Sequence, residues 1–257
     1  MMINKERMLF FINGVEVSAK DVEKWEFKRL KRTQKYLRKK FDLEKDINNV
    51  SSDLNNLSEK VVNTKLNLGF DKIRETMKCR YKLGNLMSLM AEKLSFGNRK
   101  FCITEIYVPN SDLNSTEIMN AISEVMMEHN DKNDLMNIVS NPDHYVLLGR
   151  TDNLQEVLEI TGGSPLPTRF FAEYYNETKL KSKKSSDYDV ELPGVAKLEN
   201  GVIIGGMRHQ VKRENDGFRF KALVEFPGIL PNSMIKQHQL HLACEFGHWI
   251  SFVLDEK

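Results

Sequence analysis

The chain has 257 residues, of which 40% are hydrophobic and 29% are charged. This composition is ordinary for a folded chain, and it excludes a mostly disordered or a collagen-like protein. The formal net charge of +2 hides an asymmetry, because residues 1–99 carry a net charge of +9 and residues 100–257 a net charge of −7. We therefore expect two domains, a basic one at 1–99 and an acidic one at 100–257.

The cysteines and the apolar runs bear on the location of the protein. Cys79, Cys102 and Cys244 are odd in number and far apart, which favours the reducing cytoplasm. The run from Met8 to Ile12 is too short for a signal peptide, and no later run approaches the roughly 18 apolar residues of a membrane span. We expect no transmembrane segment. The 26 lysines against 12 arginines, together with 22 asparagines, are compatible with a low-GC bacterium or its phage.

The first elements expected are a β-hairpin and a long helical region. Asn13-Gly14 supplies the positive φ angles of a two-residue turn after Met8–Ile12. Ser18 and Asp21 resemble a capping box, which predicts that a helix begins near Ala19. No glycine or proline occurs from Val15 to Leu68, so the region should be helical over most of this length.

Apolar residues in this helical region are spaced like those of a coiled coil. They alternate by four and three residues, and the positions expected to mediate self-association are Ile47, Val50, Leu54, Leu57, Val61 and Leu68. A homodimer is the expected state. The alternative is a helical hairpin within one chain, in which a second helix from about Lys72 to Leu94 folds back on the first after Gly69.

After Phe101 the pattern changes to that of an α+β domain. The predicted elements are strands at Phe101–Val108 and His144–Leu148, helices at Ser115–Glu128 and Asp152–Ile160, a hairpin turning at Asn215–Gly217, and two strands within Leu240–Leu254. The fold class predicted is therefore α+β: an N-terminal β-hairpin and a long helical region, followed by an α+β domain with a C-terminal antiparallel β-meander.

A cluster of basic residues is the first candidate site. Eight positive charges fall within thirteen residues without one acidic residue: Lys28, Arg29, Lys31, Arg32, Lys35, Arg38, Lys39 and Lys40. Such a helix can neutralise the phosphates of a nucleic acid or another polyanion. A basic stretch before a zipper resembles the layout of basic-zipper transcription factors. Residues 22–46 contain no asparagine, however, so sequence-specific base contacts are not expected. The alternative is a solvated helix face.

Metal-ligating residue types gather near the C-terminus. His238, His241, Cys244 and His248 have side chains that bind zinc. On a helix, His238, His241, Glu245 and His248 would share one face. The alternation of apolar residues predicts a strand instead, which places His241 on the face opposite His238 and Cys244. We therefore expect no metal site and no cofactor.

A short match to a nuclease pattern is the last candidate. Pro142-Asp143 and Glu177-Thr178-Lys179 follow the order of residues in Mg²⁺-dependent nucleases. Asp143 precedes a strand rather than ending one, and Glu177 lies in polar sequence, so no catalytic residue is assigned.

The function expected from these patterns is that of a non-enzymatic cytoplasmic binding protein of phage or mobile-element origin. It would self-associate through its helices and contact nucleic acid non-specifically, or a host protein. The alternative is a metal-dependent nuclease or hydrolase seated in the C-terminal α+β domain.

Overall fold

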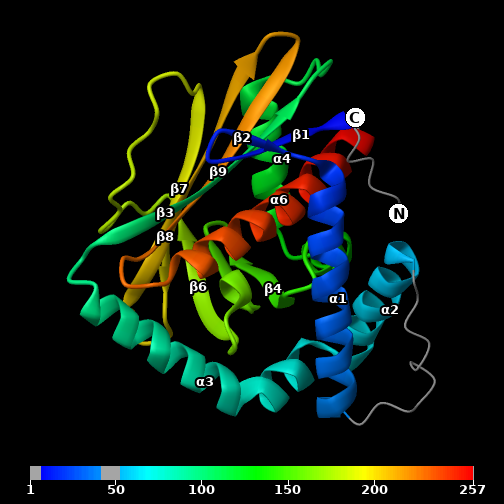
Figure 1. Cartoon of the computed structure of the whole chain (residues 1–257), viewed down its shortest axis with the longest axis vertical. Coiled ribbons are helices and arrows are strands. Elements are labelled where there is room, and N and C mark those ends of the chain that lie inside the picture. Colours follow the sequence, from blue (N-terminus) through cyan, green and yellow to red (C-terminus); the bar gives the residue numbers. More distant parts are fainter. Residues whose placement is uncertain (1–6, 42–52, 257) are drawn as a thin grey trace.

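The computed structural model describes residues 7–41 and 53–256 and contains one antiparallel β-sheet within these ranges (Figure 1). Its nine strands lie in the order β2-β1-β3-β9-β8-β7-β6-β5-β4. Their bounds are β1 Leu9–Ile12, β2 Val15–Val17, β3 Arg99–Val108, β4 His144–Thr151, β5 Leu154–Glu159, β6 Thr168–Tyr174, β7 Val190–Lys197, β8 Ile203–Glu214 and β9 Gly217–Pro227.

Six α-helices in the described residues pack around this sheet. They are α1 Ala19–Phe41, α2 Leu54–Leu68, α3 Phe70–Leu94, α4 Ser115–Met127, α5 Asp131–Val139 and α6 Asn232–Asp255. In Figure 1, α6 runs diagonally across the sheet, and α1 crosses α6 toward its C-terminal end. None of the described helices is long and apolar enough to cross a membrane.

Alternation along β4 and β5 places apolar side chains in two separate cores. Leu147 and Val157 pack in the larger core with α4 and α6. Val146, Leu148 and Leu158 point to the opposite face and pack in the smaller core with residues of α1, α2 and α3. The β4–β5 end of the sheet is therefore covered on both faces, and α6 packs against α1 as well as against the sheet.

The coarse fold class, α+β, is confirmed, whereas the long coiled-coil or helical-hairpin region is not shown. Leu57 and Val61 have exposed fractions of 0% and 1% and pack inside the same chain against Leu30, Leu37 and Ile73. Leu54 and Leu68 are half-buried at the edge of this core. Ile47 and Val50 lie outside the described residues. The heptad spacing thus reflects helix packing within one chain, as far as the described residues extend.

Two secondary-structure predictions for the second half of the chain were wrong. Residues 154–159 form strand β5, not a helix, and the two C-terminal strands are the single helix α6. The antiparallel sheet is also larger than a hairpin plus a meander, because β1 pairs with β3 and extends the sheet formed by later strands. Residues on both sides of position 99 therefore share one sheet. Whether 100–257 folds alone stays a prediction.

Candidate metal centre

Two histidines and two glutamates converge in the interior. His144 is the first residue of β4 and Glu159 is the last residue of β5, and the two lie opposite each other in the strand register. His241 and Glu245 lie one turn apart on α6, which faces this end of the sheet. All four residues are buried. Ligand atoms of His144, Glu159 and His241 lie within 4.8 Å of one another.

The distances between these atoms match the coordination sphere of a metal ion. The Nε2 atoms of His144 and His241 are 3.3 Å apart. Oε2 of Glu159 lies 3.5 Å from Nε2 of His144 and 3.7 Å from Nε2 of His241. Glu245 approaches the two histidines with different oxygens, Oε1 at 3.2 Å from Nε2 of His144 and Oε2 at 3.8 Å from Nε2 of His241. A tetrahedral ion bound at about 2.1 Å separates its ligands by about 3.4 Å. His144, Glu159 and His241 could therefore hold a divalent ion such as Zn²⁺ with little movement, and Glu245 could become a fourth ligand if its carboxylate turned to bring one oxygen to the ion.

Neighbouring groups orient two of the ligands. Nδ1 of His144 lies 2.9 Å from the carbonyl oxygen of Asn137, so a proton on Nδ1 leaves Nε2 free to bind a metal. The Thr161 hydroxyl donates a hydrogen bond of 2.8 Å to Oε1 of Glu159, while Oε2 of the same carboxylate faces the histidines. The arrangement is that of a ligand set supported by outer hydrogen bonds.

Electrostatics favour a bound cation. Burial raises the pKa of Glu159 to about 7, and the charge of Glu245 contributes to this rise. Burial acts to lower the pKa of His144, but the hydrogen bond and the charge of Glu245 outweigh it, so this pKa lies above its ordinary value. Burial, together with His238 and His144, holds the pKa of His241 well below its ordinary value. A dication would neutralise the two carboxylates while both histidines stay uncharged.

Three of the metal-ligating groups line a partly open cavity of about 290 Å³. Glu159, His241 and Glu245 contribute to its wall, and the rest of the wall is mostly apolar: Met126, Leu147, Val157, Phe170, Met207, Phe226, Phe246 and Trp249. Polar side chains also line it, and some of their nitrogens lack a partner in the described part of the chain. Nδ1 of His209, Nδ1 of His238 and Nε1 of Trp249 have no hydrogen-bond partner within the described residues. The cavity therefore offers a small apolar ligand a few polar contacts beside the candidate ion.

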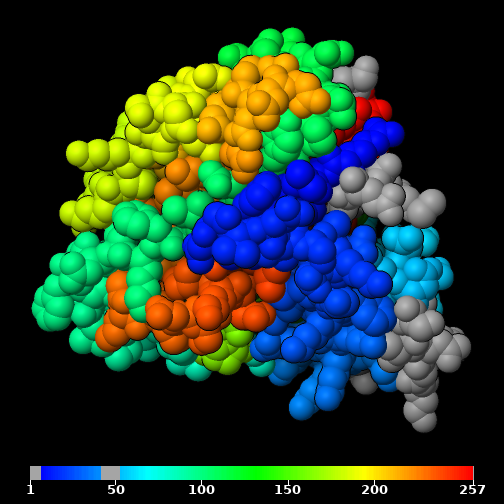
Figure 2. All heavy atoms as spheres, turned by 45° about the horizontal axis from the view of Figure 1, so that its top comes forward, coloured from blue at the N-terminus to red at the C-terminus, as the bar shows by residue number. Residues whose placement is uncertain are grey.

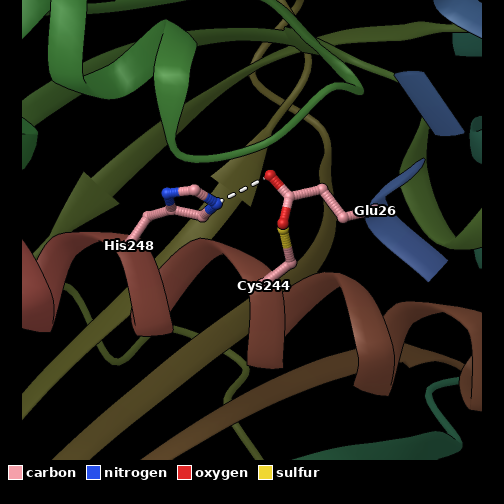
Figure 3. A group of neighbouring side chains, drawn as sticks. All are labelled: Glu26, Cys244 and His248. Carbon is pink, nitrogen blue, oxygen red and sulfur yellow. Dashed lines mark hydrogen bonds and ion pairs between the residues drawn. The ribbon is translucent and has the colours of Figure 1, made fainter. Parts of the chain in front are cut away.

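A second buried cluster lies between α1 and α6 (Figure 3). One oxygen of Glu26 lies 2.8 Å from Nε2 of His248, and its other oxygen points toward the sulfur of Cys244. The 2.8 Å separation between Glu26 and His248 is that of a hydrogen bond. It is well below the roughly 3.4 Å expected between two ligands of a tetrahedral ion. This cluster therefore joins the two helices by hydrogen bonding, and the candidate metal centre is the first cluster.

The C-terminal metal-ligating residues separate into these two groups because α6 is a helix. His241 and Glu245 belong to the candidate centre, and Cys244 and His248 contact Glu26. His238 lines the cavity, with its ring stacked on that of His241 at a centroid distance of 4.6 Å. The prediction that a strand sends His241 to the opposite face was wrong, so that argument against a metal site here does not hold.

The nuclease-like pair has different partners. Asp143 is buried and forms a bidentate ion pair with Arg29. Glu177 is exposed and pairs with Arg208. Because each carboxylate has its own arginine, the structure does not bring them together as a metal-binding pair.

The basic residues of α1 do not all lie on its surface. Arg29 is buried by its contact with Asp143, and Arg38 is half-buried. The exposed members of the group are Lys28, Lys31, Arg32, Lys35, Lys39 and Lys40. Figure 2 shows the outer face of α1, in blue, at the surface of the molecule.

Sequence reasoning missed His144 and Glu159 as site residues, and it placed Glu245 with His241 only in the helical alternative that was not chosen. The signal for the α6 pair was its i, i+4 spacing, which requires the helix to be recognised. Glu159 gave no signal, because the segment preceding it was predicted as a helix. His144 was recognised only as the start of a strand.

Comparison with protein-family models and with curated proteins finds no match to this chain.

Metal affinity should depend on pH through Glu159. Because its pKa is raised to about 7, a metal ion must displace a proton from this carboxyl group below that pH. Because His144, whose pKa is also raised, must lose a proton as well, we expect the apparent Zn²⁺ affinity to rise by about tenfold to a hundredfold per pH unit from pH 5.5 to 7 and to level off only above the pKa values of both groups. Competition with a chromogenic chelator at each pH measures this. A flat profile over the range would contradict it.

Proposed function

We propose that the protein is a metal-dependent hydrolase that acts on a small, largely apolar carbonyl compound. The observation that carries this proposal is the set formed by His144, Glu159 and His241, with Glu245 beside it, next to a largely apolar pocket that all but His144 line. This proposal develops the hydrolase alternative derived from the sequence and names different residues for it.

The position of the ligands favours a catalytic over a structural ion. Structural zinc sites are closed and are commonly rich in cysteine, whereas catalytic sites use histidine and carboxylate ligands and keep a position open to substrate. Here three of the four ligating side chains line the cavity directly. An ion bound to them would therefore meet whatever molecule fills the cavity.

The chemistry follows from this placement. A bound divalent ion activates water near neutral pH and polarises a carbonyl oxygen. The oxygen of Glu245 that does not bind the ion would lie beside the same site, where it would accept a proton from the attacking water and return it to the leaving group. The apolar wall excludes other water and selects a neutral substrate.

Metal loading and turnover test the proposal together. The purified protein is stripped with a chelator, reloaded with Zn²⁺, Co²⁺, Mn²⁺ or Fe²⁺, and assayed with small neutral aryl esters such as para-nitrophenyl acetate. We expect one tightly bound equivalent and turnover that is lost with the chelator and restored with metal. Failure of every ion to bind, or turnover indifferent to the chelator, would reject the hydrolase.

A second candidate, a binding protein, is favoured by the exposed basic face of α1. Six basic side chains are exposed along this helix. We propose a non-specific contact with nucleic-acid phosphates through Lys28, Lys31, Arg32, Lys35, Lys39 and Lys40.

A homodimer or a host-protein partner belongs to the same proposal. Helix α3 offers an apolar surface for such a partner through the exposed Leu83, Leu86 and Met90. Light scattering over a range of concentrations tests the dimer.

Removing four of the exposed charges of α1 should weaken nucleic-acid binding at low salt. We expect the variant with Lys31, Arg32, Lys35 and Lys39 replaced by glutamine to remain folded, because glutamine keeps helix propensity. Its slope of log K against log[salt] on duplex DNA should flatten by up to about 0.9 per lost contact. Fluorescence anisotropy on two unrelated sequences measures this. Equal affinity of the variant and the wild type would remove the polyanion role.

A further inference from the structure

The turn that leads into His144 is held by side chains from the N-terminal helices. The Thr33 hydroxyl of α1 donates a hydrogen bond of 3.1 Å to the carbonyl oxygen of Pro142. Lys65 of α2, whose exposed fraction is 0%, donates to the same oxygen at 2.9 Å and also to the carbonyl oxygen of His144. Two helices distant in sequence therefore fix the backbone that carries one candidate metal ligand.

Arg29 fixes the side chain of Asp143 in the same turn. Its Nε and Nη2 atoms donate to Oδ1 at 3.0 and 2.6 Å, whereas Oδ2 accepts from Nε alone, at 2.7 Å. Both side chains are at least nine-tenths buried. This fork sets the plane of the carboxylate and leaves Oδ2 with room for a further donor.

That oxygen faces the second histidine of the candidate centre. Oδ2 of Asp143 is 4.0 Å from Nδ1 of His241, and Nδ1 of His241 has no hydrogen-bond partner within the described residues. Asn141 links the two residues further, because its Oδ1 accepts from the backbone N–H of Asp143 at 3.0 Å and its Nδ2 donates to the carbonyl oxygen of His241 at 3.1 Å. His241 thus lacks the outer partner that His144 finds in Asn137.

We propose that Asp143, aimed by Arg29, is the carboxylate that orients His241 for metal binding. The inference rests on the proposed metal centre. When an ion binds Nε2 of His241, the proton stays on Nδ1, and a small rotation of the ring brings this N–H into hydrogen-bonding distance of Oδ2. A metal-bound histidine that donates to a carboxylate is fixed in tautomer and orientation. Asp143 and Arg29 are therefore positioning residues and do not touch the substrate.

Asp143→Asn tests this role in the full-length protein. Asparagine keeps the size of the side chain but is a weaker acceptor for the His241 N–H. We expect the Kd for Zn²⁺ to rise about 10–100-fold, the usual effect of losing an outer partner of a metal ligand. The visible absorption spectrum of the Co²⁺-loaded protein should also change, because the ligand field depends on the orientation of His241.

Glu156→Gln is the matched control. Glu156 is equally buried and is also bound by an arginine of the N-terminal helices, Arg74, at 2.9 Å. It contacts neither histidine of the centre. We expect this variant to lose thermal stability but to keep the wild-type Kd and Co²⁺ spectrum. Equal changes in the two variants would show that any broken ion pair loosens the site, and would overturn the inference.

Arg29→Lys keeps the experiment decisive if Asp143→Asn does not fold. Lysine retains the charge but not the two-pronged contact, so Kd should rise less than in a folded Asp143→Asn variant, by a few-fold, and the Co²⁺ spectrum should shift in the same direction. If a folded Asp143 or Arg29 variant kept the wild-type Kd and spectrum, the inference would be overturned while the proposed metal centre would stand. Absence of metal binding by the wild type would instead reject the proposed function, and the inference with it.

Discussion

Replacing Glu159 with glutamine or His241 with alanine is expected to remove metal binding and metal-dependent turnover together. Each change deletes one of four ligating side chains, so the loss of affinity should exceed the roughly 10–100-fold of an outer-shell substitution. Equilibrium dialysis followed by metal analysis should find less than one equivalent bound at metal concentrations that saturate the wild type. Hydrolysis of para-nitrophenyl acetate should then match the metal-free protein.

His209→Gln is the matched control for these two variants. His209 is a buried histidine that lines the same cavity from β8, and none of the four ligating residues is among its ring contacts, Phe220 and Phe246. The His209→Gln variant should therefore retain one equivalent of metal even if turnover changes. Full metal binding by Glu159→Gln and His241→Ala would show that the four side chains do not form a metal centre.

The candidate centre depends on two elements whose type the sequence pattern did not reveal. In α6, nearly every residue from His238 to Val253 is buried, so apolar side chains occur on all sides of the helix and also fit the alternation of a strand. The two strands predicted within Leu240–Leu254 would meet about Gly247. In the structure it lies inside the helix, and a Cβ there would lie 3.2 Å from the ring of Phe10, which packs against this position.

Strand β5 was predicted as a helix for a different reason. Apolar residues occur on all sides of α6, whereas polar residues point to both faces of β5. Gln155 donates to the backbone of Met126 on one face, and Glu156 on the other face is bound by Arg74, Arg150 and Arg169. Burial opposes ionisation of Glu156, but these arginines outweigh it and lower its pKa to about 2. The partners come from distant segments, so a buried polar strand looks like an exposed helix in the sequence.

Elements whose signals are local were predicted well. The hairpin at Asn13-Gly14, the start of α1 after Ser18, the cap at Gly69 and the β8–β9 hairpin all depend on a few adjacent residues. The charge asymmetry had a less direct meaning. Arg29 was counted as part of a basic surface, but it forms a buried ion pair with Asp143, which belongs to the acidic residues 100–257. Charge along a helix does not reveal which members turn inward to a partner distant in sequence.

The cavity itself arises from a row of small residues across the sheet. Ala172 of β6 pairs with Ala196 of β7, and Ala196 pairs with Gly205 of β8, so three neighbouring strands present almost no side chain at the same level. All three residues line the cavity. Larger residues at this level, as elsewhere in the sheet, would fill the space beside the candidate ion.

Ala172→Phe should therefore abolish ligand binding in the cavity while leaving the metal in place. The added ring occupies the space between β6 and α6, so we expect an at least tenfold loss of affinity for the neutral apolar probe N-phenylnaphthylamine and a matching rise in KM for aryl esters. Overpacking costs about 1–3 kcal/mol, so the unfolding temperature is measured in parallel, and the milder Ala196→Val tests the same wall. The control is Ala121→Phe, at a half-buried position of α4 that is outside the cavity wall. This variant should bind the probe normally. Normal probe affinity and turnover in folded Ala172→Phe, with one equivalent of metal bound, would show that substrate reaches the ion by a route other than this cavity.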